Sequence, residues 1–320
     1  MSLSLAWITI ISFTFFLYIV LDGFTLGIGI MLPFFKPDDK DIAVSTILPT
    51  WDGNQTWLVF SLAALYGMFP IAFAYILPKI YLPALLLAGM LLFRGICFEF
   101  RLKSIKGIKA WDITFSISSI GITFIHGYLA GQIVIGYHQE LYSVGLSFKI
   151  FTGLVLVMGY MLLGSTRLML KTEGNLLLNA QKISLNLTKI LPIFMALVGV
   201  FTFYYHDLPL WNHDKLIILF IIGILIIIDI ICLYHSVKKQ YNFLSYWLSV
   251  ILFTLSYLSM LAYIFPYIIP YKMTYHQASA APTTLAFTLI IACIMIPVLL
   301  VYTGYSYYIF RGKTKKKLSY

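Results

Sequence analysis

The sequence predicts an all-α polytopic membrane protein, and three observations support this fold class. Hydrophobic residues make up 61% of the 320-residue chain and charged residues only 11%, whereas a soluble domain has about 25% charged residues. The mean hydropathy is +0.91. The apolar residues form continuous runs long enough to cross a bilayer, whereas a β-barrel would show short alternating segments.

Nine runs are long enough for transmembrane helices. They cover residues 5–33, 56–77, 80–98, 113–136, 147–169, 188–205, 215–235, 243–269 and 283–309. The first is not expected to be a cleaved signal, since residues 1–20 contain no Lys or Arg. Only Leu77-Pro78-Lys79 separates the second and third spans, which predicts a tight hairpin. The short loops leave no room for a soluble domain, so residues 1–320 should form a single integral membrane domain.

The net charge of +10 reflects topology rather than binding to nucleic acid. With nine spans, all of the 22 basic residues lie on one side except Lys79, Lys149, Lys215 and Lys272. The positive-inside rule then places the N-terminus outside and the C-terminus in the cytoplasm. The basic tail is expected to lie near anionic membrane lipid.

The spacing of small residues predicts two close helix contacts. Gly23 and Gly27 are four residues apart in the first span, and Gly127 and Gly131 in the fourth. Such pairs let membrane helices approach closely.

Metal and haem ligands are sparse in this sequence. The three cysteines lie in apolar runs without paired spacing, which predicts neither a disulfide framework nor a metal site. His126 is the only histidine in the middle of a span, and a lone histidine there more often packs or hydrogen-bonds than ligates haem. Asp229 is a lone acid in the seventh span. The chain carries no complete catalytic constellation of its own.

One polar stretch precedes the second span. Residues 49–57, Pro-Thr-Trp-Asp-Gly-Asn-Gln-Thr-Trp, place Asp52, Asn54 and Gln55 at the start of a predicted helix, between Trp51 and Trp57. Asp52 is either a helix cap beside an interfacial aromatic anchor or part of a functional site. The stretch alone favours neither interpretation.

Charged residues inside the membrane are costly unless they are paired or hydrated, so each is a functional candidate. Asp22 lies in the cytoplasmic half of the first span, and the span directions bring Asp52, Arg94 and Glu99 near the same depth. In a structural interpretation, Arg94 either reaches the interface or pairs with Asp22 or Glu99. In a functional one, these residues line a hydrated proton path from the cytoplasm.

The chain resembles subunit II of cytochrome bd-type quinol oxidases, with short loops most like the cyanide-insensitive branch. The resemblance rests on motifs that run in order along the chain. They are Leu-Asp-Gly-Phe-Thr-Leu-Gly at 21–27, the stretch at 49–57, Phe-Arg-Gly at 93–95, Phe-Glu-Phe-Arg at 98–101, Leu-Leu-Gly-Ser-Thr at 162–166, Lys-Thr-Glu-Gly at 171–174, Phe-Pro-Tyr-Ile-Ile-Pro at 265–270 and Phe-Arg-Gly-Lys at 310–313.

The resemblance implies two four-helix bundles plus one peripheral helix, and a similarly folded subunit I that holds the haems and the quinol site. It implies that this subunit binds no haem or metal. A structural quinone or lipid and a small single-span partner are left open. It places Asp52 on a cytoplasmic proton route and Trp57 near an oxygen route. Many members carry a second acid where this chain has Thr25, so the role of that acid is in doubt here.

The sequence therefore predicts a haem-free subunit of an oxidase that oxidises quinol and reduces oxygen to water in a bacterial cytoplasmic membrane. Its proton-pathway candidates are Asp52, Asp22, Asn54, Gln55 and Glu99. The alternatives are a secondary transporter, with Asp22, Asp52 and Arg94 as its coupling site, and a scaffold that only stabilises the haem-bearing subunit. No inverted repeat is detectable, which argues against the transporter.

Overall fold

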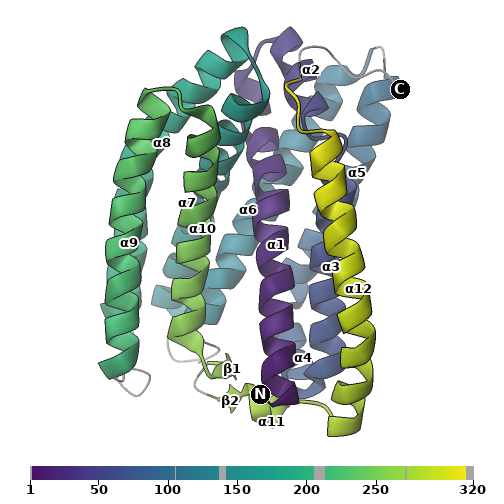
Figure 1. Cartoon of the computed structure of the whole chain (residues 1–320), viewed down its shortest axis with the longest axis vertical. Coiled ribbons are helices and arrows are strands. Elements are labelled where there is room, and N and C mark those ends of the chain that lie inside the picture. Colours follow the sequence, from purple (N-terminus) through teal and green to yellow (C-terminus); the bar gives the residue numbers. More distant parts are fainter. Residues whose placement is uncertain (1, 105, 137–141, 205–212, 271, 315–320) are drawn as a thin grey trace.

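The computed structural model describes residues 2–104, 106–136, 142–204, 213–270 and 272–314. Long helices stand side by side, as Figure 1 shows. The elements are α1 (Leu3–Met31), η1 (Leu32–Phe34), α2 (Pro37–Ser45), α3 (Trp51–Met68), α4 (Pro70–Ile76), η2 (Leu77–Lys79), α5 (Tyr81–Lys103), α6 (Ile108–Ile135), α7 (Tyr142–Lys171), α8 (Gly174–Tyr204), α9 (His213–Lys238), α10 (Asn242–Ile264), β1 (Tyr267–Ile269), β2 (Met273–Thr274), α11 (Tyr275–Ala278) and α12 (Pro282–Ile309).

The prediction of an all-α membrane protein is confirmed. Within the described ranges, eight helices are long and apolar enough to cross a membrane, or nine if a bent pair counts as one span. That pair is α3 and the segment 70–79, which meet at 110°. The predicted continuous span 56–77 is therefore wrong. Pro70 begins α4 at its first position, and a proline cannot donate the hydrogen bond that would continue α3 past Phe69.

Two other predicted spans have different bounds in the structure. The sixth, expected at 188–205, belongs to α8, which begins at Gly174. The added segment, residues 174–187, contains exposed polar residues such as Lys182. The helix therefore continues beyond the apolar run that predicted the span. The eighth, expected at 243–269, ends with α10 at Ile264, because Pro266 follows. Residues 267–269 instead pair as β1 with the antiparallel β2.

Helix α1 is packed against α3, α6 and α7, and α7 is in turn packed against α8 and α10. The predicted close contacts are confirmed. A Cβ atom built on Gly27 would lie 1.8 Å from the Tyr160 carbonyl oxygen on α7, and one on Gly127 would lie 2.6 Å from the Thr152 carbonyl oxygen. Glycine at these positions lets the backbones of α1 and α6 touch α7.

The connection between α10 and α12 covers the bend between α3 and α4. The Ala280 amide donates to the Met68 carbonyl oxygen at 2.9 Å, and Phe69 is packed with Tyr275 and Trp7 in one buried cluster. The break in the span is thus enclosed by protein, which satisfies a backbone group that lipid could not.

Helices α1 and α12 begin at the same end of the molecule and finish at the opposite end (Figure 1). We call the latter the basic end, since Arg101, Lys103, Lys171, Lys238 and Arg311 follow or finish the helices there. The grouping into two bundles with one peripheral helix, the treatment of 1–320 as one domain and the cytoplasmic assignment of the basic end stay predictions.

Candidate functional site

A charge pair lies buried between α1 and α5. The Arg94 Nη2 atom donates to Asp22 Oδ1 at 2.8 Å, and neither side chain has exposed surface. This geometry decides between the partners predicted for Arg94 in favour of Asp22. Removing two charges from water is costly, and their attraction offsets this cost only when further hydrogen bonds complete the site.

Thr25 supplies one of those hydrogen bonds. Its hydroxyl lies 2.6 Å from Asp22 Oδ1 and 2.7 Å from the Asp22 carbonyl oxygen. The residue that replaces the second acid of related chains thus contacts the first acid, one helical turn away. A neutral donor at position 25 leaves Arg94 with a single carboxylate as its counter-charge among the described residues.

The Asp22–Arg94 pair has unused hydrogen-bonding capacity. Asp22 Oδ2, Arg94 Nε and Arg94 Nη1 are buried and have no hydrogen-bond partner among the described residues. One helical turn from Asp22, the Tyr18 hydroxyl lies 3.4 Å from His126 Nε2 on α6. The sequence offered one signal for Tyr18, since positions i and i+4 of a helix share a face, but it was not singled out.

Asn54 connects the start of α3 to this pair. Its Nδ2 atom donates to the Leu21 carbonyl oxygen at 2.7 Å, and its Oδ1 atom accepts from the Tyr307 hydroxyl at 2.9 Å. Three helices, α1, α3 and α12, are therefore joined through one buried amide. Leu21 directly precedes Asp22, so the polar stretch before the second span contacts the backbone next to the intramembrane acid.

Asp52 lies two residues before Asn54 and is exposed in the first turn of α3. Of the two interpretations left open for Asp52, the structure contradicts the helix cap: Thr50 is the N-cap residue, and its side chain makes no capping hydrogen bond. A carboxylate in the first turn still favours the helix through the macrodipole. The next residue inward, Gln55, has a buried Nε2 atom without a hydrogen-bond partner in the described part of the chain.

Trp57 lies farther along α3, and only 1% of its surface is exposed. It is packed in one buried cluster with Tyr18 and Leu58. The indole predicted to border an oxygen route is therefore adjacent to the tyrosine that contacts His126.

Glu99 does not belong to this site. Its carboxylate binds Lys103 at 3.1 Å, and its side chain is 65% exposed. The prediction that Glu99 reaches Arg94 is wrong. Positions 94 and 99 are five residues apart, so they point to different faces of α5.

The sequence analysis missed a second charged network at the basic end. Arg101 donates through Nε to Asp112 Oδ1 at 2.6 Å and through a terminal nitrogen to Asp41 at 2.9 Å, and Lys40 lies 3.7 Å from Asp112. These contacts tie α2, α5 and α6 together. Arg101 had been counted only as a topological charge.

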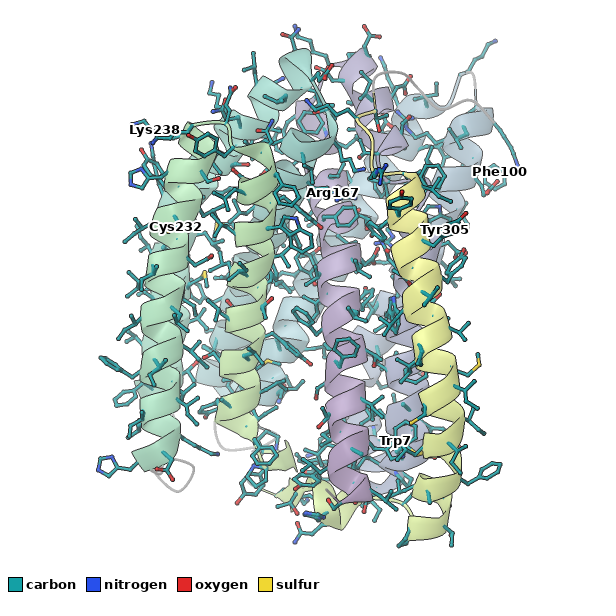
Figure 2. The ribbon with its side chains drawn as sticks, in the orientation of Figure 1. Trp7, Phe100, Arg167, Cys232, Lys238 and Tyr305 are labelled. Carbon is teal, nitrogen blue, oxygen red and sulfur yellow. The ribbon has the colours of Figure 1, made fainter. Side chains whose placement is uncertain are left out.

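Arg167 was also counted only as a topological charge. It lies near the basic end (Figure 2), over the rings of Phe24, Tyr246 and Tyr307 at 4.7, 5.0 and 5.5 Å. The three rings come from α1, α10 and α12, so the cation–π contacts join these helices to α7.

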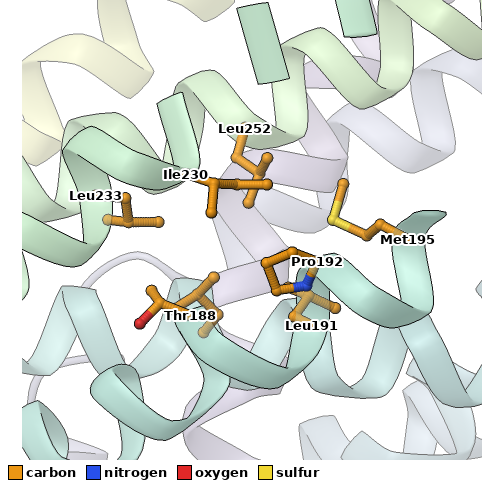
Figure 3. Close-up of a pocket in the computed structure, with 8 residues that line it drawn as sticks. Thr188, Leu191, Pro192, Met195, Ile230, Leu233 and Leu252 are labelled. Carbon is orange, nitrogen blue, oxygen red and sulfur yellow. The ribbon is translucent and has the colours of Figure 1, made fainter. Parts of the chain in front are cut away.

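A small apolar pocket lies between α7, α8, α9 and α10, beside Pro192 in α8 (Figure 3). It has no room for a water molecule, so we place no quinone or lipid in it.

Metal ligands do not cluster in the described ranges: no group of three His, Cys, Asp or Glu side chains there could hold a metal ion. His126 has one ring nitrogen directed at Tyr18 and the other, Nδ1, buried without a partner among those residues. The prediction that this chain binds no haem stays a prediction.

Comparisons with known proteins identify the family. Residues 3–310 match the family described as cytochrome bd terminal oxidase subunit II. The chain is 24% identical to cytochrome bd-I ubiquinol oxidase subunit 2 of Escherichia coli (strain K12), over 94% of this chain and 92% of that one. It is 31% identical to cytochrome bd ubiquinol oxidase subunit 2 of Bacillus subtilis (strain 168), over 38% of each.

The fold agrees with this match. A chain of the bd oxidase from Geobacillus thermodenitrificans superposes with a TM-score of 0.81 at 16% identity, covering 95% of this chain and 97% of that one. The comparisons do not favour a secondary transporter. The chain belongs to the cytochrome bd terminal oxidase subunit II family, as a multi-pass protein of the bacterial inner membrane and one subunit of a terminal oxidase with a partner subunit I.

Proposed function

We propose that this subunit gives protons access to the oxidase from the cytoplasm, while it stabilises a haem-bearing subunit I and binds no haem itself. In this arrangement the basic end faces the cytoplasm and the N-terminus lies outside. Protons reach the interior through Asp52, Asn54 and Gln55 to Asp22, and Trp57 borders the path of oxygen.

The single observation that carries the proposal is the connection from an exposed acid to a buried one. Asp52 is exposed at the start of α3, and two residues later the Asn54 amide binds the backbone at Leu21, next to Asp22. The Nε2 atom of Gln55, which is buried and has no hydrogen-bond partner among the described residues, lies on the same turn. Unpaired polar atoms of this kind are often satisfied by internal water, which can conduct protons.

The chemistry requires a proton supply at every turnover, because the reduction of oxygen to water consumes protons. A carboxylate near the basic end can take up a proton from water and release it inward. The low dielectric of the membrane interior would expel an isolated carboxylate, but Arg94 and Thr25 stabilise the charged form of Asp22.

Asp52→Asn tests the proposal. Asparagine matches aspartate in shape, and the lost interaction of an exposed carboxylate with the helix macrodipole costs only about 0.3–1 kcal/mol, but an amide cannot take up and release a proton. We expect an assembled complex with normal haem content and a quinol oxidase rate at least about tenfold lower, by analogy with the loss of a proton-transfer group. The measurement is oxygen consumption per complex in membranes.

Glu99→Gln is the matched control, because it removes an exposed acid near the basic end that lies outside the site. Its rate should equal that of the wild type. Full activity of Asp52→Asn would overturn proton access through this acid and leave the scaffold role. Loss of assembly in Asp52→Asn would show that this acid is structural.

A further inference from the structure

A row of polar side chains continues from Asp22 away from the basic end. Tyr18 lies one helical turn before Asp22 on the same face of α1, and its hydroxyl contacts His126 Nε2 at 3.4 Å with the two rings edge to face, 5.4 Å between centroids. Tyr18 is 1% exposed. This row of side chains thus runs from Arg94 on α5 through α1 to His126 on α6, entirely inside the protein.

Both ends of this row of side chains carry polar atoms that have no hydrogen-bond partner in the part of the protein that the structure describes. At one end are Asp22 Oδ2 and two Arg94 nitrogens, and at the other are His126 Nδ1 and Thr123 Oγ1, which is fully buried one turn before His126 on α6. A buried polar atom left unsatisfied costs about 1–3 kcal/mol. Several of them around one set of side chains indicate internal water, or a function that offsets the cost.

We propose that Tyr18 and His126 form a hydrated proton relay with Asp22 and Arg94, in which His126 holds the proton at the end remote from Asp52. The relay deepens the proposed function and rests on it, since protons arrive at Asp22 by way of Asp52. Histidine suits this position because it has two ring nitrogens, so a proton can be accepted at Nε2 and released from Nδ1.

One transfer moves a single proton from Asp22 to His126. The O–H bond of protonated Asp22 breaks and its proton passes to the Tyr18 oxygen, directly or through a bridging water. The original O–H bond of Tyr18 breaks and an N–H bond forms at His126 Nε2. Asp22 becomes a carboxylate paired with Arg94, Tyr18 stays neutral, and His126 becomes an imidazolium. Loss of the Nδ1 proton to an internal water leaves the Nε2–H tautomer, and the ring must turn or exchange its protons with that water before the next transfer. No electrons are exchanged.

The alternative is that the Tyr18–His126 contact only ties α1 to α6. Tyr18→Phe keeps the ring and its packing against Trp57 but removes the hydroxyl. His126→Gln replaces the imidazole with a neutral amide, which can still form a hydrogen bond but cannot take up a proton. Tyr257→Phe is the matched control: its hydroxyl ties α10 to α1 through the Ser12 carbonyl oxygen at 2.9 Å, outside the relay.

The experiment measures oxygen consumption and proton uptake by the complete oxidase reconstituted in liposomes, in H₂O and in D₂O. We expect Tyr18→Phe and His126→Gln to lower both rates by about tenfold or more and to increase the solvent isotope effect, while Tyr257→Phe keeps wild-type values. Wild-type rates in both relay variants would overturn the relay.

A second measurement does not depend on the stability of the variants. An experimental map of the assembled oxidase should show ordered water within hydrogen-bond distance of Asp22 Oδ2 and His126 Nδ1, and apolar side chains that seal both atoms would overturn the relay. The two proposals fail separately. If Asp52→Asn slows turnover and Tyr18→Phe does not, only the relay is wrong. If Tyr18→Phe slows turnover and Asp52→Asn does not, protons reach the relay by a route that does not include Asp52.

Discussion

The interior between α1, α5 and α6 holds a fully buried charge pair, whereas the interior between α7, α8 and α10 is held by pairs of hydroxyl groups. In the first region Arg94 binds Asp22, and atoms of both residues remain unpartnered among the described residues. In the second, Ser184 donates to Ser165 at 2.7 Å, and Thr166 lies 2.8 Å from Ser249.

The difference lies in what each region leaves unsatisfied. Each of the hydroxyls at 165, 166 and 249 also lies within hydrogen-bond distance of a backbone carbonyl oxygen of its own helix, so it still has an acceptor if its side-chain partner disappears. The charged groups of the ionic region have no second counter-charge among the described residues, and a buried charge without its partner is strongly destabilising. The hydroxyl pairs act as ties between helices, and the ionic region has the groups that could handle protons.

Arg94→Ala should have the largest effect. Asp22 would remain as an uncompensated charge, at a cost of about 3–5 kcal/mol, so the subunit should fail to assemble with its partner. The measurement is the amount of this chain that copurifies with subunit I. The double variant Arg94→Ala with Asp22→Asn should recover much of the assembly, since no charge is then left buried. Normal assembly of Arg94→Ala alone would contradict the pairing.

Gly27→Ala should have an intermediate effect and shows whether close contact, rather than charge, holds α1 to α7. The added methyl group would meet the Tyr160 carbonyl oxygen at 1.8 Å, so the two backbones must separate. Overpacking of this kind costs about 1–3 kcal/mol. Thermal unfolding of the purified complex measures it. Gly199→Ala is the control, because a Cβ atom there meets nothing within 4 Å, and equal melting temperatures for both variants would contradict the prediction.

The sequence was sufficient for the fold class and for the acids and arginine of the ionic region. Continuous apolar runs identify membrane helices, and an ionisable residue inside such a run stands out by its cost. The bend at Phe69 and the end of α10 before Pro266 were missed, since hydropathy continues across both prolines. One proline removes a backbone hydrogen-bond donor and can end a helix, but it hardly changes the mean hydropathy of the run that contains it.

The partners within the site were harder to predict than its members. Arg94 had two candidate acids, and only the helix rotation in the structure directs it to Asp22 and leaves Glu99 on the exposed face. Tyr18 looks like an ordinary residue of an apolar helix in the sequence. Its contact with His126 joins α1 to α6 between residues 108 positions apart, which no local pattern encodes.

Thr166→Val should have the smallest effect and tests the other side of the comparison. Valine keeps the shape of threonine but removes the hydroxyl that faces Ser249 across α7 and α10. Ser249 still donates to the Tyr246 carbonyl oxygen at 2.7 Å, so no buried donor is left without an acceptor. Side-chain hydrogen bonds between membrane helices contribute about 0.6 kcal/mol on average, and we expect a loss of that size in thermal unfolding, with normal assembly and an unchanged oxidase rate. A loss of assembly like that of Arg94→Ala would contradict the distinction between the two regions, since a tie with its own backbone acceptor would then matter as much as a buried charge.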